Sequence, residues 1–106
     1  MPSDFVINVG KQFNRFPAGR FLADGPWSGE RFRDEVLAPA LKGGARVVVE
    51  LDDTLGYGSS FLEEAFGGLV RTGVLPSTEL TRRIELLTED ESLKLEILSY
   101  IEEANG

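Results

Sequence analysis

The chain has 106 residues, a formal net charge of −7, and neither cysteine nor histidine. This length suffices for one hydrophobic core, so we expect a single domain over residues 1–106. The missing residue types exclude disulfides, thiolate and histidine metal sites, and imidazole acid–base catalysis. We expect neither a metal nor a cofactor.

The charge is distributed unevenly along the chain. Residues 1–48 hold seven Lys or Arg and five Asp or Glu, whereas residues 49–106 hold four and thirteen. Without a concentrated basic face, nucleic acid is not an expected ligand, and the acidic half suits a basic surface of a partner protein. No apolar run is long enough to span a bilayer, and the N-terminus lacks a signal-peptide pattern. We therefore expect a cytoplasmic protein that does not bind membranes.

The N-terminal half predicts strands followed by a helix. Alternating apolar residues predict a strand over residues 4–9. Two further short strands are expected at 11–15 and 19–23, in a stretch interrupted by glycine and proline. Ser28 is a suitable N-cap for a helix that ends near residue 41, and Pro39 should bend or interrupt that helix.

The central segment predicts a strand and then the clearest helix of the chain. Residues 47–51 form a nearly continuous β-branched run, which is typical of a strand covered on both faces. Apolar residues at helical spacing then predict a helix from Ser60 to Gly73. Gly67 and Gly68 weaken that helix, so their retention suggests that something packs closely against its backbone.

The C-terminal segment predicts a strand at 82–87 and a last helix. Thr88 and Glu91 match a capping box, which would start that helix at Thr88. Because strands alternate with helices, we predict an α/β fold with a mixed sheet of about four strands, covered by about three helices.

The segment at residues 50–62, which reads ELDDTLGYGSSFL, resembles the signature of STAS domains, the fold of anti-anti-sigma factors. In that signature an apolar strand ends in Asp-Leu, and Asp-Ser-Ser-Gly-Leu follows at a helix start. Ser59 and Ser60 align with the serine pair, while Gly58 stands in place of the acid and Phe61 in place of the glycine.

The whole chain is closer to the small bacterial STAS-like family of unknown function. Its motifs Gly-Arg-Phe, Ser-Gly-x-x-Phe-Arg and Ser-Ser-Phe-Leu-x-Glu-Ala are present at residues 19–21, 28–33 and 59–65.

The resemblance implies a non-enzymatic switch controlled by phosphorylation. Ser60 would be the residue phosphorylated by a partner serine kinase with an ATPase fold, and Ser59 is the second candidate. An added phosphate brings nearly two negative charges and alters an interface through repulsion or desolvation. The alternative is that Ser60 only caps the helix, in a capping box with Glu63.

The expected partner-binding surface surrounds the start of this helix. It comprises the loop and first-turn residues together with an acidic rim: Asp52, Asp53, Tyr57, Gly58, Ser59, Ser60, Glu63 and Glu64.

Three other interpretations are open. Asp52 and Asp53 follow a buried strand, where α/β sheets place ligands, so a small Mg²⁺-dependent phosphohydrolase or phosphotransferase is the alternative function. A homodimer that packs through Gly67 and Gly68 is another. Independently of these, Ser28 and three arginines could form an anion site, unless the arginines pair with neighbouring acids; the arginines are Arg20, Arg31 and Arg33.

Overall fold

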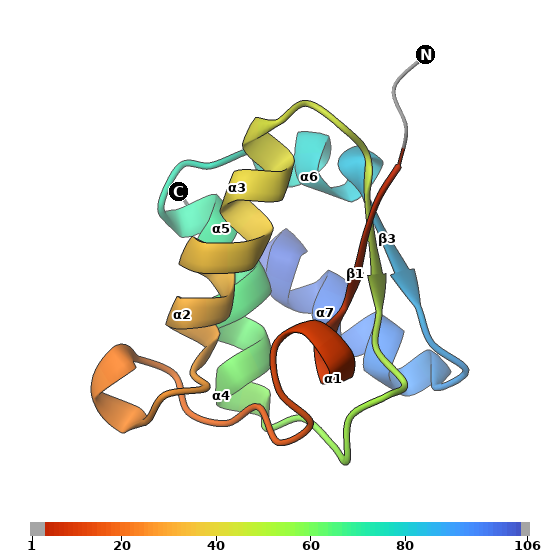
Figure 1. The fold of residues 1–106 in the computed structure, drawn as a ribbon. Helices are drawn as coiled ribbons and strands as arrows, with labels where there is room; N and C mark the ends of the chain where they lie inside the picture. The colour runs from red at the N-terminus through yellow and green to blue at the C-terminus, as the bar shows by residue number, and fades with distance from the viewer. Residues whose placement is uncertain (1–3, 105–106) are drawn as a thin grey trace.

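A three-stranded parallel sheet forms one layer of the molecule (Figure 1). The computed structural model describes residues 4–104, and the expected domain extends beyond them to residues 1–3 and 105–106. The strands lie in the order β1-β2-β3. Their bounds are Phe5–Asn8 for β1, Val47–Glu50 for β2 and Ile84–Leu87 for β3.

The α/β prediction is confirmed, but the prediction of a mixed sheet with about four strands is not. In the described part of the chain the sheet is entirely parallel and has three strands. The expected strands at 11–15 and 19–23 are replaced by the short helix α1 (Val9–Gln12) and the 3-10 turn η1 (Leu22–Asp24). Local side-chain bonds favour these turns, because Asn8 Oδ1 accepts from the Lys11 N–H at 2.9 Å.

The first crossover between strands is one continuous helix in three parts. These are α2 (Gly29–Phe32), the wider π-helical turn η2 (Arg33–Leu37) and α3 (Ala38–Lys42). Ser28 is its N-cap, as predicted, with Oγ accepting from the Arg31 N–H at 3.2 Å. The expected interruption at Pro39 was wrong. The Ala38 N–H donates to the Arg33 carbonyl, five residues earlier in the chain. Because of this wider turn, the helix continues through Pro39, which has no N–H to donate.

The second crossover repeats this design and adds a separate helix. Its parts are α4 (Ser59–Leu62), the π-helical turn η3 (Glu63–Gly67), α5 (Gly68–Arg71) and the separate helix α6 (Ser77–Arg83). The last helix, α7 (Glu91–Glu103), follows β3. Its N-cap is Asp90, which accepts from the Leu93 N–H at 3.1 Å. The predicted start at Thr88 was wrong, because the Thr88 hydroxyl donates to Asp52 instead.

The core lies on one face of the sheet, between the strands and the helices (Figure 1). Right-handed crossovers between successive neighbouring strands place all connecting helices on the same side. Val47 and Val49 of β2 belong to this core, whereas Val48 points to the opposite face and lies outside it. Val48 is nevertheless only 7 % exposed, so the side chains on both faces of β2 are buried, as expected, although the helices pack on one face alone. Among residues 4–104, no helix combines the length and apolar character that crossing a bilayer requires.

Glycines allow the long helices to pack closely. A Cβ at Gly29 would overlap the Phe61 carbonyl oxygen, so α2 crosses α4 at this point. Gly67 and Gly68 are buried within their own chain, because Cβ atoms added there would lie 3.2 Å from the Tyr100 oxygen and 3.1 Å from the Arg33 Cδ. The close approach predicted at these glycines is confirmed. Since it is made within the chain, these glycines are not available as the contact of a homodimer.

We predict that Gly29→Ala destabilises the fold, whereas Gly58→Ala does not. The first substitution forces α2 away from α4 and should lower the free energy of unfolding by about 1–3 kcal/mol. Gly58 is the matched control, because its φ is −75° and nothing lies within 4 Å of the place that a Cβ would take. Urea unfolding of both variants measures the difference. An equal midpoint for the two variants would contradict close packing at Gly29.

Candidate functional site

The serine pair lies exposed in the first turn of α4, which starts at the end of the molecule where the strands terminate (Figure 1). The N-cap is Gly58, which has no side chain, so Ser60 is the second helical residue and does not cap the helix. The predicted capping box was therefore wrong, since Glu63 bonds to arginines instead. Within residues 4–104 the hydroxyls of Ser59 and Ser60 have no hydrogen-bond partner, which leaves both accessible to another molecule.

Aromatic side chains pack against the core side of the serine turn. Phe61 is fully buried, with its ring centroid 5.8 Å from that of Phe32 and 6.1 Å from that of Phe13. The Tyr57 ring stacks on Phe61 at 6.1 Å, and its hydroxyl donates to the Leu51 carbonyl at 2.8 Å. Burial, together with the charges of nearby aspartates, raises the pKa of Tyr57 to about 12. The phenol thus stays protonated near neutral pH and keeps donating to the loop.

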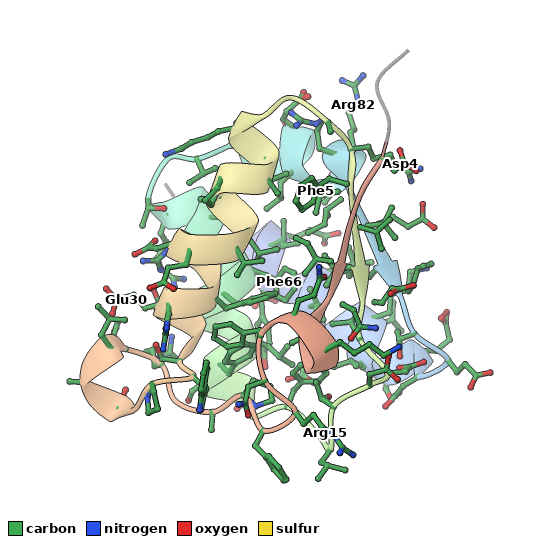
Figure 2. All side chains as sticks on the ribbon, viewed as in Figure 1. Asp4, Phe5, Arg15, Glu30, Phe66 and Arg82 are labelled. Carbon is green, nitrogen blue, oxygen red and sulfur yellow. The ribbon has the colours of Figure 1, made fainter. Side chains whose placement is uncertain are left out.

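An apolar groove borders the serine turn, and sequence reasoning missed it. The groove has a volume of about 320 Å³ and reaches from Phe16 to Gly58. Phe16 and Leu55 are each 64 % exposed beside it. The Leu55 N–H donates to the Arg15 carbonyl at 3.0 Å, and Arg15 lies at the same end of the molecule as α4 (Figure 2). The sequence signal was a pair of apolar residues in polar, glycine-rich surroundings.

We define the serine-turn surface by six residues that this end of the molecule brings together. They are Phe16, Leu55, Tyr57, Gly58, Ser59 and Ser60.

Asp52 and Asp53 lie close to this surface but turn away from each other. Asp52 accepts hydrogen bonds from the Thr88 hydroxyl and, at 2.9 Å, from the Glu89 N–H. Asp53 accepts from Asn8 Nδ2 at 2.6 Å. The two carboxylates thus tie the loop after β2 to opposite neighbours. Over residues 4–104 no group of three His, Cys, Asp or Glu could hold a metal ion, so this donor set does not support the Mg²⁺-dependent alternative.

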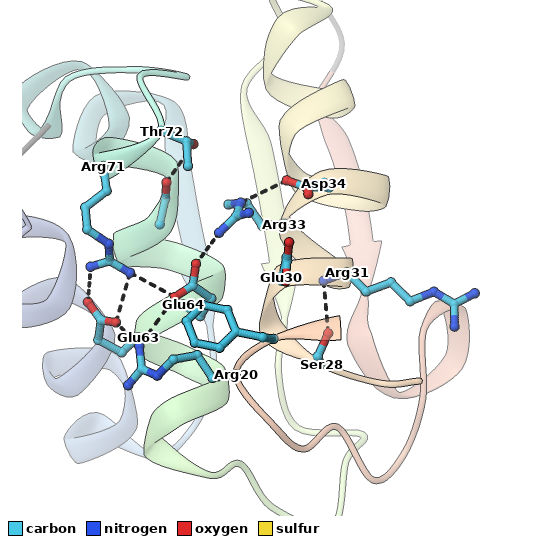
Figure 3. Close-up of polar contacts among 12 residues, drawn as sticks. Arg20, Ser28, Glu30, Arg31, Arg33, Asp34, Glu63, Glu64, Arg71 and Thr72 are labelled. Atoms are coloured by element: carbon cyan, nitrogen blue, oxygen red, sulfur yellow. Dashed lines mark hydrogen bonds and ion pairs between the residues drawn. The ribbon is translucent and has the colours of Figure 1, made fainter. Parts of the chain in front are cut away.

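Glu63 and Glu64 belong to a cluster of ion pairs between helices (Figure 3). The side chains of Glu64 and Arg33 are only 9 % and 7 % exposed, and they pair with each other. Arg71 Nη2 lies 3.0 Å from Glu63 Oε1 and 3.2 Å from Glu64 Oε1, and Arg20 Nη1 lies 2.5 Å from Glu63 Oε1. Glu64 is therefore not part of an exposed acidic rim, and Glu63 is largely neutralised.

The residues expected to bind an anion do not converge. Ser28 is fully buried as a helix cap. Arg31 Nε pairs with Glu35 at 3.1 Å and the guanidinium lies 5.0 Å from the Trp27 ring centroid. Arg20 and Arg33 reach across to the acids of the second long helix instead. These residues do not form a shared anion site, and the alternative of pairing with acids describes the arginines better.

Comparison with known proteins gives one match. A family model described as a STAS-like domain of unknown function matches residues 28–94. The matched segment runs from the N-cap of α2 into α7, and it includes the serine turn and the Arg33–Glu64 pair. No curated protein and no solved structure matches the chain.

We predict that Glu64→Ala strongly destabilises the fold. It leaves the Arg33 guanidinium buried without its partner on η3, which should lower the free energy of unfolding by about 3 kcal/mol. The matched control is the double variant Arg33→Met/Glu64→Leu, which removes both charges and should stay within about 1–2 kcal/mol of the parent. Chemical denaturation measures both. A double variant less stable than Glu64→Ala would contradict this account.

We predict that Glu63 makes the stability depend on pH in the acid range. Hydrogen bonds from Arg71, and then from Arg20, hold the pKa of Glu63 below its ordinary value of 4.5. The unfolded chain therefore binds the proton more tightly, so this stabilisation is complete above about pH 4.5 and is lost as the pH falls through the lower folded pKa. Thermal unfolding between pH 3 and 7 should show a shallower acid loss for Glu63→Gln than for the parent. Parallel curves for the two proteins would contradict the assignment.

Proposed function

Because the chain belongs to the family of STAS-like domains of unknown function, we propose that it is a non-enzymatic regulatory module. It binds a partner protein through the serine-turn surface. The partner that the resemblance suggests is a serine kinase with an ATPase fold, acting on Ser60 in the cytoplasm.

The observation that carries this proposal is the exposure of the serine hydroxyls at a helix start. A serine that serves only as a cap would accept from a backbone N–H in the first turn. Ser28 does this and is fully buried, whereas Ser59 and Ser60 are exposed. Two exposed hydroxyls above a rigid aromatic cluster are available both to a partner and to a modifying enzyme.

The chemistry around the serines supports a protein partner. Phe16 and Leu55 offer exposed apolar surface beside the groove, and burying such surface against a partner stabilises a complex. On the other side of Leu55, Asp52, Asp90 and Glu96 line a second pocket and make it acidic, whereas Arg15 lines the groove itself. A basic, partly apolar surface on the partner therefore fits this end of the molecule best.

Phosphorylation would act on this surface without unfolding the turn. The phosphate would sit in the first turn of α4, where backbone N–H groups and the helix dipole favour negative charge. Phe61 anchors the turn in the core, so the added charge would remain at the surface, where burying it against the apolar part of the partner carries a desolvation cost.

We predict that a photo-crosslinking residue at position 55 captures a partner that one at position 95 does not. Leu55 and Leu95 are matched, since both are 64 % exposed, but Leu95 lies on α7 and is not among the residues that line the groove beside the serine turn. Crosslinking in cells of the native host, read by mass spectrometry, should give a recurrent adduct only at position 55. The same adducts at both positions would contradict a specific surface.

We further predict that Ser60→Asp lowers the yield of that adduct severalfold, because the added carboxylate would lose its hydration against the apolar part of the interface beside Phe16 and Leu55. Ser77→Asp is the control, since it places the same charge in the first turn of α6. Intact mass of the protein from its native host would reveal an added phosphate, and peptide mapping would assign it. Equal yields for the parent and a folded Ser60→Asp variant would remove Ser60 from the interface.

A further inference from the structure

The outer edge of β1 is open to another strand. Phe5 N–H donates to the Arg46 carbonyl at 2.8 Å, so Phe5 bonds toward β2. The backbone groups of successive residues in a strand point to opposite edges of that strand. The N–H and C=O of Val6 therefore point away from β2, toward the open edge of the sheet. The Asn8 N–H, which points the same way, is already taken by the Gln12 side chain. Within residues 4–104, Val6 is therefore the position at which this edge offers backbone groups without a partner.

An apolar groove runs beside this edge, between β1 and the helix formed by α2, η2 and α3. Its volume is about 280 Å³, and Phe5, Val36, Pro39 and Ala40 contribute to its walls. Phe5 is 50 % exposed at its border, and Figure 2 shows this residue where β1 passes α3. Because alternate side chains of a strand point to the same face, a strand added at Val6 would direct every second side chain toward this groove.

We propose that this edge binds an extended segment of a partner protein by β-strand addition. The segment pairs with the free groups of Val6 and inserts one apolar side chain into the groove. Main-chain hydrogen bonds give such a complex its affinity, and the groove gives it selectivity for the inserted residue. The site is distinct from the serine-turn surface and does not rest on the function proposed above.

Charge indicates the chemistry of the partner segment. Glu35 is the charged residue lining the groove, and its side chain is 60 % exposed. Arg31 Nε pairs with Glu35 Oε1 at 3.1 Å, while Oε2 has no hydrogen-bond partner within residues 4–104. Asp4 is exposed at the start of β1. A lysine or arginine two positions from the inserted residue would lie on the same face and meet Glu35. A second copy of this chain fits less well, because it would bring another net charge of −7 and repeat the same acids.

The test is selection from a display library of random eight-residue peptides against the immobilised full-length chain. Enriched peptides should alternate, with an apolar residue and a Lys or Arg two positions apart. The affinity of a labelled enriched peptide, measured by fluorescence anisotropy, should fall about tenfold or more in Val6→Pro, which removes the N–H that faces the peptide. Val6→Thr keeps the N–H and should bind like the parent.

Two further variants keep the result interpretable. Glu35→Lys changes no backbone group and should weaken the same peptide severalfold, even if Val6→Pro proves unstable by thermal unfolding. Ser60→Asp should leave peptide binding unchanged. The proposal is overturned by the absence of enriched peptides or by full binding in both Val6→Pro and Glu35→Lys. Loss of binding in Ser60→Asp, or a dimer in sedimentation that Val6→Pro dissociates, would overturn it as well.

Discussion

The contact between the two long helices is organised around the buried pair of Arg33 and Glu64. Each residue lies in a π-helical turn, Arg33 in η2 and Glu64 in η3, and the two turns face each other across the helix contact (Figure 3). Such turns often mark positions under functional or structural constraint. Gly68 leaves room for the Arg33 side chain, and Gly29 lets the backbones meet one turn away. The pair thus constrains which face of α4 is buried and how closely α2 approaches it.

This constraint determines what remains exposed at the helix start. With Glu64 buried and Glu63 held between two arginines, the π-helical turn η3 that follows α4 presents mostly neutralised charge. Phe61 and Leu62 point into the core below. The serine hydroxyls of the first turn are then the polar groups of this helix that face outward without an internal partner in the described chain. A negative charge added at these hydroxyls would therefore stay exposed at the surface, because no cationic side chain of the turn is free to pair with it in the described chain.

Sequence reasoning succeeded where the signal is local and failed where contacts join distant residues. The Ser28 cap, the core strand β2 and the helix that begins at the serine pair follow from periodicity and capping chemistry over a few residues. The pairing of Arg20 with Glu63 spans 43 residues, so no local pattern could show it. The helix continues through Pro39 because a π-helical turn begins six residues earlier, at Arg33. The placement of all the connecting helices on one face of the sheet depends on the handedness of both crossovers, which a run of valines does not encode.

The same handedness explains why two separate surfaces can exist on a small domain. Both crossovers place their helices on one face of the sheet. One edge of β1 therefore pairs with β2, and beside its other edge lies the groove lined by the first long helix. The loop after β2, at the carboxyl end of that strand, places the serine pair at the start of α4. One surface offers backbone groups and an apolar slot, the other offers hydroxyls and exposed apolar anchors. Because their chemistry and their positions in the fold differ, a charge at Ser60 can alter one surface while leaving the hydrogen-bonding groups of the other in place.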